Sequence, residues 1–159
     1  MQSIFRYHGY GAYHKIRDVM LDSNCQFIEL EKVKTPLVNQ FYKRVYKKGI
    51  AGKNERVFVL KHEQQIICSA KLKSIEEDVV LTGVACDPDY QHQGYASLLI
   101  NKLLKTTNQP VYCFPYVHLE AFYLRLGFVF LSIEQAPEAI QVRFNRYQQH
   151  RDLLLMVYK

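Results

Sequence analysis

The sequence predicts a mixed α/β fold, with a central β-sheet flanked by helices in the order β-α-β-β-β-α-β-α-β-β. Short runs rich in valine and isoleucine, bounded by polar turns, are typical of strands. Between them stand stretches whose apolar residues recur with helical spacing. The unit from residue 78 to 133 alternates strand and helix, so it can pair strands in parallel through right-handed crossovers. A length of 159 residues suits one domain.

Capping and turn residues set the limits of the predicted elements. Thr35 and Pro36 open the first helix as N-cap and first helical residue, and Gly49 ends it. Gly94 precedes the second helix and Gly127 closes the third. Short connections between residues 56 and 86 favour an antiparallel meander. We expect strands at 25–33, 56–61, 65–73, 78–86, 111–115, 128–133 and 153–158, helices from 35, at 94–107 and at 118–126, and a loop or short helix at 136–146.

Composition places the chain among globular proteins. Apolar residues make up 48% and charged residues 23%, which excludes overall disorder, collagen and coiled coil. Residues 1–23 are rich in Tyr and His without a clear period, so we expect an N-terminal extension with one helical turn near 14–21, followed by a folded domain at 24–159. No apolar run approaches the roughly 20 residues of a membrane helix, and the first 20 residues contain no apolar signal segment. We therefore expect a soluble, cytoplasmic protein with no membrane partner.

The net charge of +6 is concentrated in the N-terminal third. Residues 1–60 hold 11 basic and 5 acidic residues, whereas the remaining 99 hold 10 of each sign. A basic region of this kind suits an anionic partner, such as a nucleic acid, a phosphorylated cofactor or an acidic substrate. A plain solvated face is the alternative.

The cysteines are expected to be free thiols. Cys25, Cys68, Cys86 and Cys113 are widely spaced and form no Cys-x-x-Cys pair, and each reads as a small buried apolar residue. No set of residues has the spacing of a metal site, so no metal is expected.

The segment around the end of the strand at 78–86 carries the candidate chemistry. A strand ends at Cys86, a turn follows, and a helix begins near Gly94 and Ala96. Backbone amides at a helix N-terminus carry partial positive charge and bind phosphate groups. Gly94 would let the backbone approach an anion, and Ala96 would leave the first turn unobstructed. A glycine turn before an ordinary amphipathic helix is the alternative.

Two motifs resemble the GNAT superfamily of acyl-CoA-dependent N-acetyltransferases. Residues 91–96, Gln-His-Gln-Gly-Tyr-Ala, resemble the family signature Q/R-x-x-G-x-G/A, and residues 86–90 resemble its V-x-P-x-Y lead-in, with Cys86 in the valine place. Residues 121–128, Ala-Phe-Tyr-Leu-Arg-Leu-Gly-Phe, are similar to the family's A-x-Y-x-x-x-G-F signature. The resemblance covers about residues 25–159 and is strongest at 79–133. It implies the GNAT fold and acetyl-CoA as cosubstrate.

The resemblance also implies how acetyl-CoA would bind. The backbone of Val84, Ala85 and Cys86 would pair with the pantetheine arm. An amide near Val84 or Ala85 would face the thioester carbonyl as an oxyanion hole. The family often has an asparagine at the start of the third helix, where this chain has Tyr116 and His118 instead. The amides that would cradle the pyrophosphate are those of Gln91, His92, Gln93, Gly94, Tyr95 and Ala96.

Tyr123 matches the family's tyrosine near the thioester sulfur, which makes it the candidate general acid. Moving a proton from a phenol of pKa about 10 to a thiolate whose acid has a pKa of about 8.5 is uphill by about 2 kcal/mol in water. The family often places an acidic base before the strand at 78–86, where this chain has Glu76, Glu77 and Asp78; a plain acidic turn is the alternative. The base is therefore open between this group, with Glu77 as its candidate, His118 and an ordered water. An acyl-enzyme on Cys86 or Cys113 is the alternative to direct transfer.

The sequence thus predicts an acyltransferase that moves the acetyl group of acetyl-CoA to a primary amine by direct attack in a ternary complex. The acceptor is not identified, and both a monomer and a homodimer are open. An acyl-CoA-binding sensor without turnover is a second hypothesis. A nucleic-acid module using the basic third and the Gly49-x-x-Gly52 loop is disfavoured, because a strand rather than a helix is expected after that loop.

Overall fold

The computed structural model describes residues 23–47 and 49–159. The predicted helical turn at 14–21, and the extension apart from Ser23, lie outside the described residues. The elements are β1 (Cys25–Leu30), α2 (Thr35–Val45), β2 (Glu55–His62), β3 (Gln65–Ile75), β4 (Asp78–Cys86), α3 (Tyr95–Leu104), β5 (Val111–Cys113), α4 (Glu120–Arg125), β6 (Val129–Phe130), α5 (Glu138–Gln148) and β7 (Met156–Tyr158). None of the described helices is long and apolar enough to cross a lipid bilayer.

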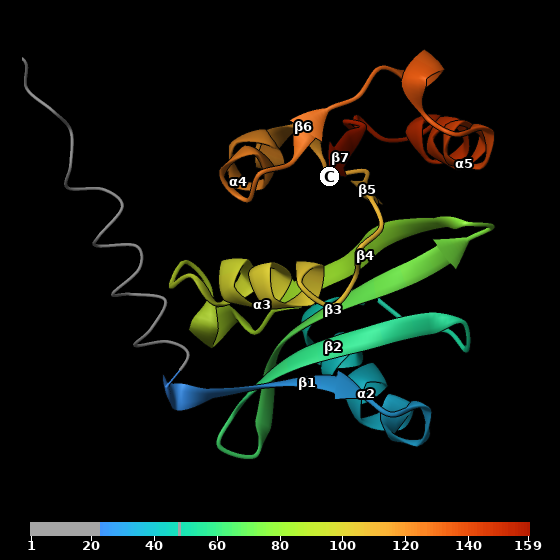
Figure 1. Cartoon of the computed structure of the whole chain (residues 1–159). Coiled ribbons are helices and arrows are strands. Elements are labelled where there is room, and N and C mark those ends of the chain that lie inside the picture. The colour runs from blue at the N-terminus through green and yellow to red at the C-terminus, as the bar shows by residue number, and fades with distance from the viewer. Residues whose placement is uncertain (1–22, 48) are drawn as a thin grey trace, which may run out of the picture.

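The strands form one seven-stranded sheet in the order β1-β2-β3-β4-β5-β7-β6 (Figure 1). β1 to β4 are the predicted antiparallel meander, and β4 pairs with β5 in parallel. The expectation that parallel pairing can extend to the strand after α4 is wrong, because β7 inserts between β5 and β6 and pairs antiparallel with both. Burial explains the order, since Met156 and Val157 of β7 are buried while Val129 and Phe130 of the edge strand β6 are about half exposed.

Helices cover both faces of the sheet. Leu99 and Leu103 of α3 and Tyr123 of α4 belong to the core on one face. On the other face, α2 packs Val38, Phe41 and Tyr42 against β2, and α5 packs Ile140 and Phe144 against β4, β5 and β7. A mixed α/β sheet flanked by helices is therefore confirmed.

The start of α2 differs from expectation, and two helices end earlier than expected, α2 at Val45 and α3 at Leu104. Thr35 does not cap α2, because a 3-10 helix (Lys32–Lys34) runs directly into it and the Thr35 hydroxyl donates back to the Lys32 carbonyl at 2.7 Å. Residues 136–146, left open between loop and helix, form most of α5, whose buried Ile140 and Phe144 are four residues apart.

Candidate functional site

β4 and β5 pair over three residues only and then separate. Val79, Val80 and Leu81 face β5, and the rest of β4, up to Cys86, has no partner strand on that side within the described chain. Beyond β5 the chain turns toward β7 and forms an isolated bridge from Tyr116 to Leu153. The backbone of β4 from Thr82 onward therefore presents a free hydrogen-bonding edge to an opening in the middle of the sheet.

A β-bulge interrupts β4 at this opening. Ser69 faces Ala85 and Lys71 faces Thr82, so two residues of β4 stand opposite one residue of β3. Gly83 occupies the bulge with a φ of 61°, and a side chain there would meet the Cε of Lys71 at 2.6 Å. Glycine suits this turn of the strand, because it adopts a positive φ at little cost and has no side chain to displace Lys71.

Tyr42 of α2 binds the bulge by hydrogen bonds from the face of the sheet that α2 covers. Its buried hydroxyl donates to the Gly83 carbonyl at 2.6 Å and lies 3.0 Å from the Ser69 hydroxyl. Burial raises the pKa of Tyr42, with the Ser69 hydrogen bond opposing, so the hydroxyl keeps its proton for this bond. Because a peptide unit is planar and trans, fixing the Gly83 carbonyl also fixes the opposite direction of the Val84 N–H.

A cavity of about 580 Å³ runs through the opening between β4 and β5. This size is within the usual range of small-molecule sites. It reaches both faces of the sheet, with Leu119 and Tyr123 on the α4 side and Lys71 and Tyr147 on the side of α2 and α5. Gly83 and Val84 of the bulge form part of its wall.

Tyr123 lines this cavity from α4. Its ring is buried, with edge-to-face contacts to Phe122 and Phe128. No described residue hydrogen-bonds its hydroxyl, whose pKa is raised by burial and, to a smaller extent, by the neighbouring Cys113. Tyr123 is therefore held rigidly, remains protonated and has a proton free to donate into the cavity.

The segment after β4 forms a second, separate feature. Asp87 begins a 3-10 helix (Pro88–Tyr90) by accepting a hydrogen bond from the Asp89 amide at 3.1 Å. His92 and Gly94 adopt left-handed conformations, with φ of 61° and 97°, and α3 starts at the next residue. The first amides of a helix have no acceptor within it, so this loop and the start of α3 offer N–H groups to an anion.

Asp87 anchors this loop to the rest of the fold. The Arg44 guanidinium donates to its buried carboxylate at 2.5 Å, and Gln65 lies 3.4 Å away. Burial alone would raise the pKa of Asp87, but the hydrogen bonds from Arg44 and Asp89 and the charge of Arg44 outweigh it and lower the pKa. The carboxylate therefore stays ionised and ties α2 to the end of β4.

The predicted cofactor-binding residues follow one another along the chain, from the bulge in β4 to the start of α3. Val84 lines the cavity, and the chain continues through Ala85 and Cys86 into the loop. Gln91 and Gln93 donate their side-chain amides to the carbonyls of Cys86 and Asp89. Within the loop the remaining predicted residues follow in order: His92, Gly94, and then Tyr95 and Ala96, which begin α3.

The expectation of four free thiols is wrong for Cys68 and Cys86, which form a disulfide between β3 and β4. The two residues stand directly opposite each other in the antiparallel register, with their Cα atoms 4.2 Å apart. Cys25 and Cys113 take part in no disulfide, and burial raises the pKa of the Cys113 thiol well above its ordinary value. Neither Cys86 nor Cys113 thus provides a thiolate at the opening.

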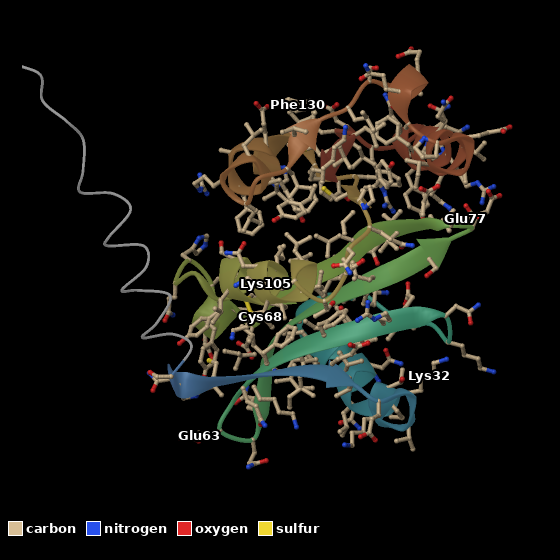
Figure 2. The ribbon with its side chains drawn as sticks, viewed as in Figure 1. Lys32, Glu63, Cys68, Glu77, Lys105 and Phe130 are labelled. Carbon is tan, nitrogen blue, oxygen red and sulfur yellow. A yellow bond between two sulfur atoms is a disulfide. The ribbon has the colours of Figure 1, made fainter. Side chains whose placement is uncertain are left out.

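The structure does not bring the two candidate bases to the cavity wall. Figure 2 shows Glu77 at the tip of the β3–β4 hairpin, at the far end of β4 from the bulge, where it is exposed. His118 is exposed in a 3-10 helix (Val117–Leu119) before α4, stacked on the cavity-lining Tyr116 with ring centroids 5.7 Å apart. His118 is therefore beside the cavity, whereas Glu77 is remote from it.

Sequence reasoning missed a buried ion pair in the wall of the cavity between β4 and β5. Lys71 of β3 and Glu55 of β2 have their Nζ and Oε2 atoms 3.0 Å apart, and both side chains are at most 9% exposed. Lys71 also donates to the Ile50 carbonyl, and Glu55 Oε2 accepts from the Gly52 amide at 2.6 Å. The available signal was a lysine within the apolar run of residues 66–72, where a charge is out of place unless it has a partner.

Comparison with known proteins identifies this architecture. Residues 53–130 match the family model described as an acetyltransferase (GNAT) domain. The chain carries a GNAT acetyltransferase domain. The match runs from just before β2 to the end of β6, so it includes the bulge, the loop before α3 and Tyr123. The predictions of the family and of an acyltransferase are thereby confirmed. A search of curated proteins finds no significant match.

Solved structures share the fold of this GNAT domain at low sequence identity. The ribosomal-protein-S18-alanine N-acetyltransferase from Escherichia coli is 19% identical, with a TM-score of 0.62 over 84% of this chain and 92% of that one. An N-acetylglutamate synthase from Neisseria gonorrhoeae, complexed with coenzyme A and N-acetyl-glutamate, is 16% identical, with a TM-score of 0.62 over 84% of this chain but 34% of that one. A spermidine/spermine N-acetyltransferase from Vibrio cholerae is 19% identical, with a TM-score of 0.58 over 86% and 94%.

Proposed function

We propose that this protein transfers the acetyl group of acetyl-CoA to a primary amine by direct attack in a ternary complex. The observation that carries the proposal is the cavity in which the bulged edge of β4 and the Tyr123 hydroxyl meet. When bound, acetyl-CoA supplies an acetyl group activated as a thioester. Every other requirement of the reaction falls on residues of this chain.

Acetyl-CoA fits the features around β4. The edge of β4 at Val84 and Ala85 has no partner strand within the described chain and can pair with the amides of a pantetheine arm, as a missing strand would. The carbonyls on either side, those of Gly83 and Cys86, already accept from Tyr42 and Gln91. At the end of that edge, the N–H groups of residues 92–96 suit a pyrophosphate, whereas that of Gln91 already donates to the Pro88 carbonyl. The left-handed Gly94 at the start of α3 leaves the backbone open to the anion, because it has no side chain.

The bulge is the proposed site of carbonyl polarisation. The Val84 N–H points away from Tyr42, and Val84 itself lines the cavity. A backbone N–H held rigidly in a cavity wall stabilises negative charge without reorganising during the reaction. The backbone N–H of Val84, with that of Ala85 next to it, would thus donate to the acetyl carbonyl oxygen.

Removing the hydroxyl of Tyr42 is expected to impair this donor. Tyr42→Phe leaves the Gly83 carbonyl without its hydrogen bond, so the peptide that carries the Val84 N–H is less firmly oriented. We expect kcat to fall about fivefold, with the Kd of acetyl-CoA changed by less than about twofold, since one hydrogen bond contributes about 1 kcal/mol. Steady-state kinetics and calorimetry check this. Tyr112→Phe, at another buried tyrosine that does not line the cavity, serves as the control, and equal kcat values in the two variants would contradict the role of Tyr42.

Tyr123 is the proposed acid for the departing thiolate. Its raised pKa makes full proton transfer harder than in water, so its main contribution is a hydrogen bond that strengthens as negative charge develops on sulfur. Its ring contacts fix the direction of that bond.

The acceptor amine must lose a proton to attack. Of the predicted candidates, His118 is beside the cavity and Glu77 is remote from it, so we favour an ordered water or His118 as the base. Direct attack is favoured over an acyl-enzyme, because Cys86 is in a disulfide and the Cys113 thiol stays protonated.

Turnover separates this proposal from an acyl-CoA sensor. The purified protein would be incubated with acetyl-CoA and a panel of primary amines, with release of the CoA thiol and mass of the acetylated amine as readouts. Acetylated product supports the proposal. Tight binding of acetyl-CoA without turnover of any amine would favour the sensor, and neither binding nor turnover would reject both.

A further inference from the structure

The side of the cavity that faces α2 and α5 carries an excess of positive charge. Among the described residues, its wall contains the cations Lys71, Lys73 and Arg151 and one carboxylate, that of Glu55. Lys71 and Glu55 neutralise each other as a buried pair. The excess therefore belongs to Lys73 and Arg151.

These two cations come from different parts of the fold. Lys73 lies two residues beyond Lys71 on β3, so both project from the same face of the sheet. Arg151 follows α5, and Tyr147 of that helix lines the same cavity four residues earlier. Neither Lys73 nor Arg151 has an ion pair with any described residue. Two unpaired cations around one cavity create a positive potential that attracts an anion.

The phosphates of acetyl-CoA do not account for this charge. In the sheet register Lys73 stands opposite Val80, six residues before Cys86, and a strand rises about 3.3 Å per residue. The anion-binding loop at 91–96 lies beyond Cys86, and none of its residues lines the cavity. Lys73 is thus roughly 20 Å along β4 from the end of the strand that leads into this loop. Arg151, which follows α5, lines the same cavity as Lys73. Lys73 and Arg151 are therefore placed to bind the acceptor rather than acetyl-CoA.

We infer that the acceptor is an anionic amine, whose carboxylate binds between Lys73 and Arg151 while its amino group faces the opening between β4 and β5. This rests on the proposed acetyl transfer, because it names the acceptor class for that reaction. The Arg151 guanidinium can bind a carboxylate with two parallel hydrogen bonds, and Lys73 adds a point charge. A free amino acid and an acidic peptide share this chemistry.

Matched pairs of acceptors test the inference by kinetics. Amino acids and short acidic peptides would be compared with their carboxamides, and with spermidine as a polycation. We expect kcat/KM to be at least about tenfold higher for the carboxylate of each pair. Lys73→Gln and Arg151→Gln should each lower kcat/KM for the carboxylates by about tenfold, and that for the carboxamides by less than about threefold, because a hydrogen bond between charged groups contributes more than one to a neutral amide. Lys32→Gln, at an exposed lysine beside α2 (Figure 2), is the matched control.

A binding measurement makes the test independent of turnover. Calorimetry with N-acetyl-glutamate and with its diamide, in the presence of CoA, reports the anion site even in a protein that acetylates nothing. We expect the carboxylate form to bind at least about tenfold more tightly, and the Lys73→Gln/Arg151→Gln double variant to lose that preference while its Kd for CoA is unchanged. Charge reversal by Arg151→Glu should shift the preference toward spermidine.

The outcomes test acetyl transfer and the anionic acceptor separately. Carboxylate binding without turnover would reject acetyl transfer and support the anion site. Turnover that prefers spermidine or the carboxamides would support acetyl transfer and overturn the anionic acceptor. Equal binding of N-acetyl-glutamate and its diamide, or a preference kept by the double variant, would also overturn it. Which carboxylates are used distinguishes a free amino acid from an acidic peptide.

Discussion

Gly94→Asp is expected to abolish acetyl-CoA binding while leaving the protein folded. The substitution puts a carboxylate at the start of α3, among the amides proposed for the pyrophosphate. Two like charges about 4 Å apart near a protein surface repel by about 4 kcal/mol, so the affinity should fall by at least about 100-fold. Asp is among the few residues that tolerate the positive φ of this position, so the fold should be retained.

Thermal unfolding measures this effect directly. Acetyl-CoA at about 100 times its Kd stabilises the native state by about 2.7 kcal/mol, which for a chain of this size raises the midpoint by about 5–10 °C. The wild type should show this rise and Gly94→Asp should not.

Gly94→Asn is the matched control for Gly94→Asp. It has the same shape and the same tolerance of positive φ, but no charge. It should therefore keep much of the rise. Loss of binding in both variants would assign the effect to the side chain's bulk, and retention in Gly94→Asp would contradict a phosphate site at α3.

Tyr123→Phe is expected to lower kcat by about 10- to 100-fold, because a hydrogen bond to a charged group contributes about 1.5–3 kcal/mol. The substitution keeps the ring that packs between Phe122 and Phe128, and the hydroxyl it removes has no hydrogen-bond partner among the described residues. Stability and the Kd of acetyl-CoA should therefore stay close to those of the wild type. Steady-state detection of the released CoA thiol gives kcat, and calorimetry gives the Kd of acetyl-CoA.

Tyr158→Phe provides the comparison for Tyr123→Phe. Tyr158 packs against the other side of Phe128, with ring centroids 5.6 Å apart, and does not line the cavity. Its kcat should equal that of the wild type. An unchanged kcat in Tyr123→Phe as well would mean that Tyr123 is a core aromatic and that the thiolate takes its proton from water or leaves unprotonated.

Much of the fold and part of the site could be predicted from local sequence. Runs of β-branched residues separated by polar turns gave β2, β3 and β4 to within two residues at each end, because strand character and turns are set by neighbouring residues. The position of Tyr123 on a short helix closed by Gly127 followed from helical spacing and from the left-handed turn that glycine favours.

Tertiary structure alone decided which distant residues meet. The pairing of Cys68 with Cys86 and the contact of Tyr42 with Gly83 both depend on the register of β3 and β4, including a bulge that shifts it. No local pattern encodes that register, since a shift by one residue moves every later side chain to the other face.

The place of β7 and the charge of the cavity were likewise decided by the whole fold. β7 lies between β5 and β6 because its burial on both faces is favourable only inside the sheet. That insertion, together with α5, brings Arg151 to the cavity wall with Lys73, which is 78 residues away in the sequence. The sequence by itself determined most of the elements, the family motifs and the position of the candidate acid Tyr123, whereas long-range packing determined the bulge and the positive charge on one side of the cavity.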